Sequence, residues 1–66
     1  MPSYAWSANV LIDDQGLHDA RGAHRAPRAA TEVELKAAVA RDVAKRHGCT
    51  ASDVLVLDFT YSEVPG

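Results

Sequence analysis

TEVELKAAVARDVAKRHG, residues 31–48, contains the beginning, the apolar stripe and the end of one amphipathic helix. It opens with a capping box, in which the Thr31 hydroxyl accepts from the backbone of Glu34 and the Glu34 carboxylate accepts from the amide of Thr31. Further along, three apolar side chains recur at four-residue spacing and share one side of the helix, namely Leu35, Val39 and Val43. Gly48 then follows a basic last turn and supplies a left-handed stop.

Two apolar strands are predicted on either side of this helix. In residues 4–12 the side chains alternate with period two, so one face carries Tyr4, Trp6, Ala8, Val10 and Ile12. Residues 13–16, DDQG, form a polar turn after it. Residues 53–64, DVLVLDFTYSEV, predict the second strand. Strict alternation there places Val54 and Val56 on the face opposite Leu55, Leu57, Phe59 and Tyr61.

Residues 17–30, LHDARGAHRAPRAA, have two interpretations. The short preceding turn favours a hairpin return strand at about residues 19–26. Pro27 cannot donate a ladder hydrogen bond, so such a strand ends there or lies at an edge. The alternative is a basic loop. The sequence leaves both open.

The expected fold class is α+β, with a small three-stranded mixed sheet and one amphipathic helix in β-β-α-β order. All 66 residues form a single domain. A helix that connects two strands favours parallel neighbours. We expect the helix stripe to pack on Trp6, Val10, Leu57 and Phe59. The other face of the sheet is then left uncovered, and we predict a protein interface there formed by Ala5, Leu11, Val54 and Val56.

Composition favours association over internal cross-linking. The chain has one cysteine, Cys49, which excludes an internal disulfide and is typical of a reducing compartment. A domain of this size often needs another source of stability, and self-association is the one that remains. The absence of a long apolar run and of a signal-peptide pattern predicts a cytoplasmic protein without a membrane segment.

The segment RGAHRAPR, residues 21–28, is basic and contains no acid. Guanidinium groups bind phosphates and carboxylates in a bidentate manner, which makes this segment a candidate contact for nucleic acid or another anion. The candidate residues are Arg21, Arg25, Arg28, Arg41 and Lys45. Aromatic side chains do not alternate with these charges as they do in single-strand binders. A nucleic-acid partner is therefore the alternative, and a protein partner or homo-oligomer is the first expectation.

The sequence shows no pattern typical of catalysis, metal binding or cofactor binding. The spacing of His18, His24, His47 and Cys49 does not match that of a structural zinc site. Cys49 follows a helix C-terminus, where the dipole disfavours a thiolate. No pair of carboxylates is placed for acid–base chemistry, and there is no phosphate-binding glycine motif. We therefore predict no enzyme activity, no cofactor and no small-molecule substrate.

Three stretches in this order, SYAWSANVLI, ATEVELKAAVARDVAKRHG and VLVLDFTYSEV, resemble small uncharacterised proteins of high-GC actinobacteria and of their phages or plasmids. The chain departs from the Val/Thr-rich second strand of those proteins, with ARGAHRAP in its place. The resemblance implies an accessory protein that acts by contact and transfers no catalytic residue. It agrees with a small non-catalytic interaction module, with a nucleic-acid-associated regulator as the alternative.

Overall fold

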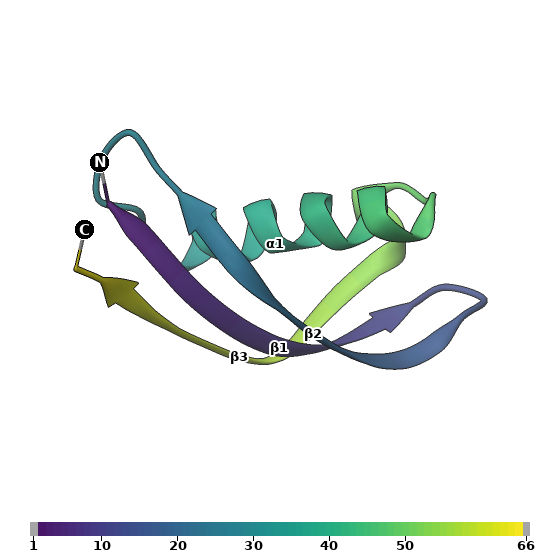
Figure 1. Ribbon diagram of the computed structural model, residues 1–66. Coiled ribbons are helices and arrows are strands. Elements are labelled where there is room, and N and C mark those ends of the chain that lie inside the picture. The colour runs from purple at the N-terminus through teal and green to yellow at the C-terminus, as the bar shows by residue number, and fades with distance from the viewer. Residues whose placement is uncertain (1, 66) are drawn as a thin grey trace.

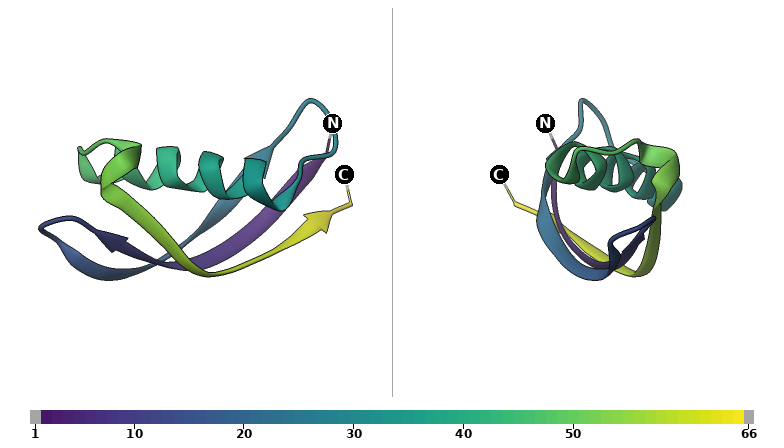
Figure 2. Two further views of the ribbon diagram at one scale, coloured as in Figure 1. Left: turned by 180° about the vertical axis from the view of Figure 1, so that it is seen from behind. Right: turned by 90° about the vertical axis from the view of Figure 1, so that its right-hand side faces the viewer.

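The computed structural model describes residues 2–65 and shows one helix lying across a three-stranded antiparallel sheet (Figure 1). The elements follow one another as β1 (Ser3–Ile12), β2 (Gly16–Arg25), α1 (Glu32–His47), a short 3₁₀ turn η1 (Ala51–Asp53) and β3 (Val54–Val64). The sheet curves around the helix, which occupies its concave side (Figure 2). The expected α+β class and the β-β-α-β order are confirmed.

The return strand is present, which decides between the two interpretations of residues 17–30. β2 pairs with β1 along its whole length, from Ser3 opposite Arg25 to Ile12 opposite Gly16. The turn between them uses positive φ angles at Asp14 (67°) and Gly16 (80°), where aspartate and glycine are tolerated. Because the turn is tight, β2 pairs with β1 directly.

The expected parallel neighbours are not found, because β3 runs antiparallel to β1 and lies on its other edge. The strand order is β2-β1-β3. The helix does connect two strands that run in the same direction, β2 and β3, but β1 lies between them. The hairpin places β2 on one edge of β1, which leaves the other edge for β3.

The helix begins and ends where the sequence predicts. The Thr31 hydroxyl accepts from the backbone N–H of Glu34 at 3.2 Å, and the Glu34 carboxylate accepts from the N–H of Thr31 at 3.0 Å. Gly48 ends the helix with φ 70°. Leu35, Val39 and Val43 are buried against the sheet. Within residues 2–65, no helix has the length and apolarity needed to cross a membrane.

The core lies between α1 and one face of β1. Every second residue of β1 is buried there, as the alternation predicts, and Val10 is fully buried with Val39 and Val43. A second cluster closes the other end of the helix, where Tyr4 packs with Ala26 and Leu35. The Tyr4 hydroxyl accepts a hydrogen bond from the backbone N–H of Ala30 at 3.0 Å, so it also holds the loop that leads into α1.

A β-bulge in β3 overturns the predicted division of its two faces. Asn9 pairs with Leu57 but Ser7 pairs with Thr60, so β3 has one extra residue between these pairs. Asp58 takes up the irregularity with φ 47°, in the left-handed region. Before the bulge the even-numbered residues face the core, and after it the odd-numbered residues do. Strict alternation could not reveal this change of face.

The prediction was therefore right for Trp6, Val10 and Phe59 and wrong for Leu57, which is 37% exposed on the opposite face. It was also wrong for Val54 and Val56, which pack against the core rather than on the uncovered face.

Candidate functional site

The face of the sheet turned away from α1, which we call the open face, has no element of residues 2–65 covering it (Figure 2). Residues that pair directly across antiparallel strands share a face, so the register shows which side chains lie there. The rows run across β2, β1 and β3 in that order. They are Leu17, Leu11 and Leu55; then Asp19, Asn9 and Leu57; then Arg21, Ser7 and Thr60; then Ala23, Ala5 and Ser62.

Four leucines at one end of the open face form what we call the leucine patch. Leu11, Leu17 and Leu55 form a single row across all three strands, and Leu57 is next along β3. Their exposed fractions are 43%, 63%, 55% and 37% in the order Leu11, Leu17, Leu55, Leu57. A contiguous apolar surface of this kind usually marks a site of interaction.

Two of the four residues predicted for the uncovered face lie on it. Ala5 and Leu11 lie on the open face, but Leu55 and Leu57 take the place of the two valines. Leu17 was missed because it lies in the segment that the sequence left ambiguous. Only the pairing of β2 with β1 brings Leu17 opposite Leu11.

The middle of the open face is polar and internally hydrogen bonded. Asn9 donates from Nδ2 to the Asp58 carboxylate at 3.1 Å, and the Ser7 and Thr60 hydroxyls are 2.9 Å apart. Beyond them is a shallow trough, lined by Ala5, Trp6, Ser7, Arg21, Gly22, Thr60, Tyr61 and Ser62. Its side chains are mostly small. They contain no pair of groups positioned for nucleophilic or acid–base catalysis.

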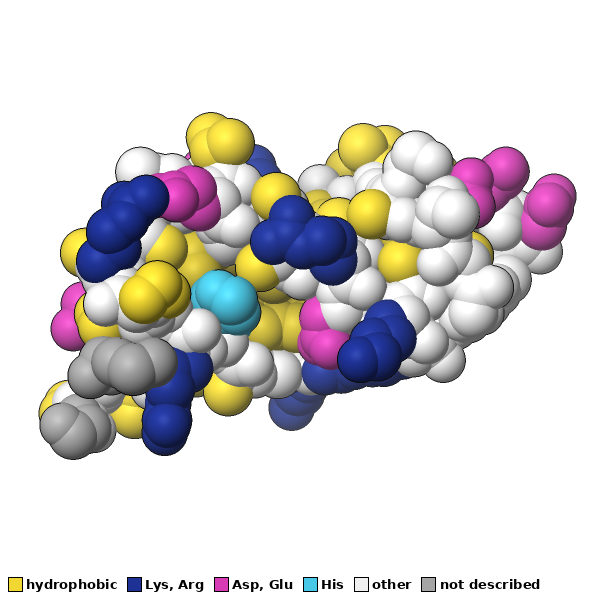
Figure 3. Space-filling view, turned by 90° about the horizontal axis from the view of Figure 1, so that it is seen from above, with side chains coloured by type: hydrophobic (Ala, Val, Ile, Leu, Met, Phe, Trp, Pro, Cys, Tyr) yellow, Lys and Arg dark blue, Asp and Glu magenta, His cyan; other side chains and the backbone are white. Residues whose placement is uncertain are grey.

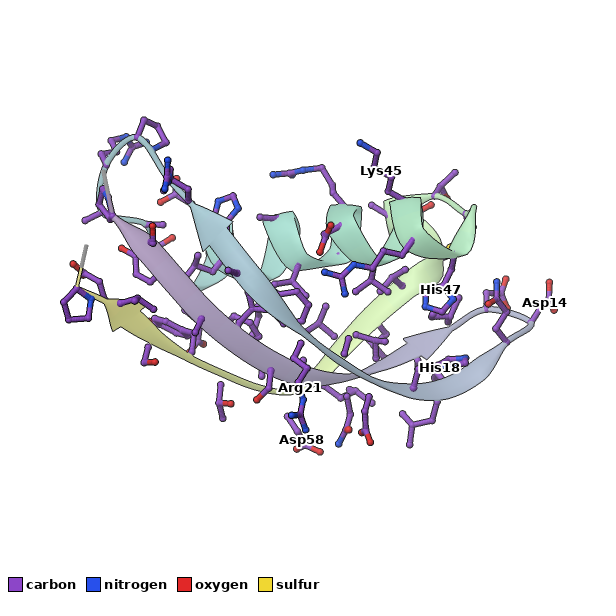
Figure 4. The ribbon with its side chains drawn as sticks, in the orientation of Figure 1. Asp14, His18, Arg21, Lys45, His47 and Asp58 are labelled. Atoms are coloured by element: carbon purple, nitrogen blue, oxygen red, sulfur yellow. The ribbon has the colours of Figure 1, made fainter. Side chains whose placement is uncertain are left out.

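The five basic candidate residues do not share one surface. Arg21 and Arg25 lie on the open face at the outer edge of β2. Figure 4 shows Arg21 and Lys45 pointing to opposite sides of the molecule. The Arg28 guanidinium is 3.6 Å from the Glu34 carboxylate, so acidic charge partly offsets it.

Arg41 and Lys45 belong instead to the exposed side of α1. On that side, basic groups alternate with acidic and apolar ones (Figure 3). The geometry therefore favours no continuous basic track for a nucleic-acid backbone.

Within the described residues, no three or more His, Cys, Asp or Glu side chains are placed to hold a metal ion. His18 and His47 nevertheless meet, with ring centres 5.1 Å apart, which their spacing in the sequence did not indicate. Cys49 is half-buried against the core, in keeping with a packed thiol.

No family model, curated protein or solved structure matches this chain.

Proposed function

We propose that this chain is a small non-catalytic interaction module that associates with a second copy of itself through the leucine patch. The observation that carries this proposal is the row of Leu17, Leu11 and Leu55 on a face that nothing in the described chain covers. Each of these side chains leaves about half of its surface in water, and Leu57 extends the same patch.

The physical reason is the small size of the core. A domain of 66 residues with a single thiol has no internal cross-link to add to it. Removing apolar surface from water contributes about 25 cal/mol per Å². Burying four leucines between two copies therefore stabilises each copy as well as the complex. An accessory role exercised by contact is also what the sequence resemblance implies.

The test is sedimentation velocity of the wild type and of three lysine variants over a wide range of concentrations. Leu55→Lys and Leu57→Lys place a charge in the patch, and we expect both to shift the protein towards monomer while the far-UV circular dichroism stays unchanged. The matched control is Val33→Lys, because Val33 is 77% exposed on α1, outside the patch. Lysine at Val56 is unsuitable, since Val56 packs against the core.

A wild type that stays monomeric at the highest concentration contradicts self-association. So does a Val33→Lys variant that dissociates as readily as Leu55→Lys, because the leucine patch would then have no special role.

A further inference from the structure

We propose that His18 and His47 form a two-histidine site for a divalent transition metal, with Zn²⁺ as the representative ion. His18 lies near the start of β2 and His47 is the last residue of α1. Figure 4 shows the two rings side by side where the hairpin passes the end of the helix. Their centres are 5.1 Å apart. This inference is independent of the proposed function, because the His18 side chain shares the face of Val10, on the helix side of the sheet, whereas the leucine patch is on the opposite face.

Hydrogen bonds to a single residue, Gln15, determine which nitrogen of each ring is available. His18 Nε2 is 2.9 Å from the backbone oxygen of Gln15, and His47 Nδ1 is 3.1 Å from the side-chain oxygen of Gln15. Both oxygens accept, so these two ring nitrogens carry the protons. In the neutral rings, the lone pairs are therefore on His18 Nδ1 and His47 Nε2.

Each ring therefore has the outer hydrogen bond that is typical of a metal-ligating histidine. A ligating imidazole almost always donates its other N–H to a carbonyl or carboxylate oxygen, which orients the ring and raises its basicity. With metal–nitrogen distances of about 2.1 Å and tetrahedral angles, two ligating rings have centres roughly 5 Å apart. The observed separation agrees with that value. Water would complete the coordination.

The surrounding charges permit a cation. The carbonyl end of α1 carries partial negative charge, and Asp13 and Asp14 precede Gln15 in the turn. Lys45 points away from the pair (Figure 4). The guanidinium of Arg46 is engaged elsewhere, 2.7 Å from the Asp42 carboxylate and over the Trp6 ring.

The experiment is a titration of the untagged full chain with ZnCl₂, followed by isothermal calorimetry and by the histidine ring signals in NMR. We expect one Zn²⁺ per chain. The signals of His18 and His47 should shift while those of His24 stay in place. His18→Gln and His47→Gln should abolish saturable binding, and Gln15→Ala should weaken it by roughly tenfold. Binding should also weaken as the pH falls, because protons compete for the same lone pairs.

Two matched variants complete the design. His24→Gln removes the third histidine of the chain, and Cys49→Ser removes its one thiol. Both should bind Zn²⁺ as the wild type does.

Several results would overturn the proposal. They are the absence of saturable binding in the wild type, loss of binding on removal of His24 or Cys49, and movement of the His24 signals alone. A stoichiometry of one Zn²⁺ per two chains would also overturn it, because the site would then be formed between copies.

Discussion

Replacement of Gly22 by alanine tests how closely β2 approaches the central aromatic residue of the core. Gly22 lies opposite Trp6 in the β1–β2 ladder. A Cβ at Gly22 would be 3.0 and 3.2 Å from Trp6 Cζ2 and Cε2, and 2.9 Å from Arg46 Nη2. Contacts this short require the neighbours to move. We therefore expect Gly22→Ala to destabilise the fold.

The magnitude follows from which neighbour can move. The guanidinium of Arg46 can swing away, at the cost of its contacts with Asp42 and with the carbonyl oxygen of Arg21. The Trp6 ring cannot move so easily, because it is 5% exposed within the core. Overpacking costs about 1–3 kcal/mol. Alanine recovers about 0.4–1 kcal/mol through the unfolded chain. The net loss is about 1 kcal/mol, or roughly 4–8 °C in melting temperature.

Urea unfolding followed by tryptophan fluorescence measures this directly, because Trp6 is the one tryptophan of the chain. Gly22→Ala is compared with the wild type and then in an Arg46→Ala background. If the indole is the obstacle, the loss persists in that background. A Gly22→Ala protein as stable as the wild type would refute the close approach of β2 to Trp6.

Two further predictions concern the N-terminal end of α1. Tyr4→Phe should lower the free energy of unfolding by about 1 kcal/mol in the same urea experiment, because the N–H of Ala30 loses its acceptor. The control is Tyr61→Phe, which should change the free energy of unfolding little, because the Tyr61 ring is half-exposed. The pKa of Glu34 lies below its ordinary value of 4.5, mainly because its carboxylate accepts from the backbone N–H of Thr31, with smaller contributions from the Thr31 hydroxyl and Arg28. Because the pKa is lowered in the folded state, the ionised carboxylate stabilises the fold at pH values above its ordinary pKa. This contribution is lost as the pH falls through the folded-state pKa. Melting temperatures measured against pH should therefore show wild type and Glu34→Gln converging in acid, and a constant difference between them would contradict this role.

The sequence was sufficient wherever structure depends on neighbours along the chain. The capping box at Thr31, the apolar stripe from Leu35 to Val43 and the stop at Gly48 are local patterns, and all three are confirmed. The alternation in β1 is equally local, and every second residue from Tyr4 to Ile12 is buried as predicted. The helix ends follow from local hydrogen bonds and backbone conformation, and the buried faces follow from helix and strand periodicity.

Only the tertiary structure decided the features that depend on contacts between distant segments. The strand character of residues 17–25 appears once β1 provides a partner, and the bulge at Asp58 appears once β3 is aligned against β1. That one extra residue reverses the faces of the first half of β3. It brings Leu55 and Leu57 to the open face and turns Val54 and Val56 to the core. The meeting of His18 with His47 likewise needs the hairpin to lie beside the end of the helix. Periodicity along one strand reveals neither a bulge nor which segments pair, so the leucine patch and the histidine pair could be found only in the folded chain.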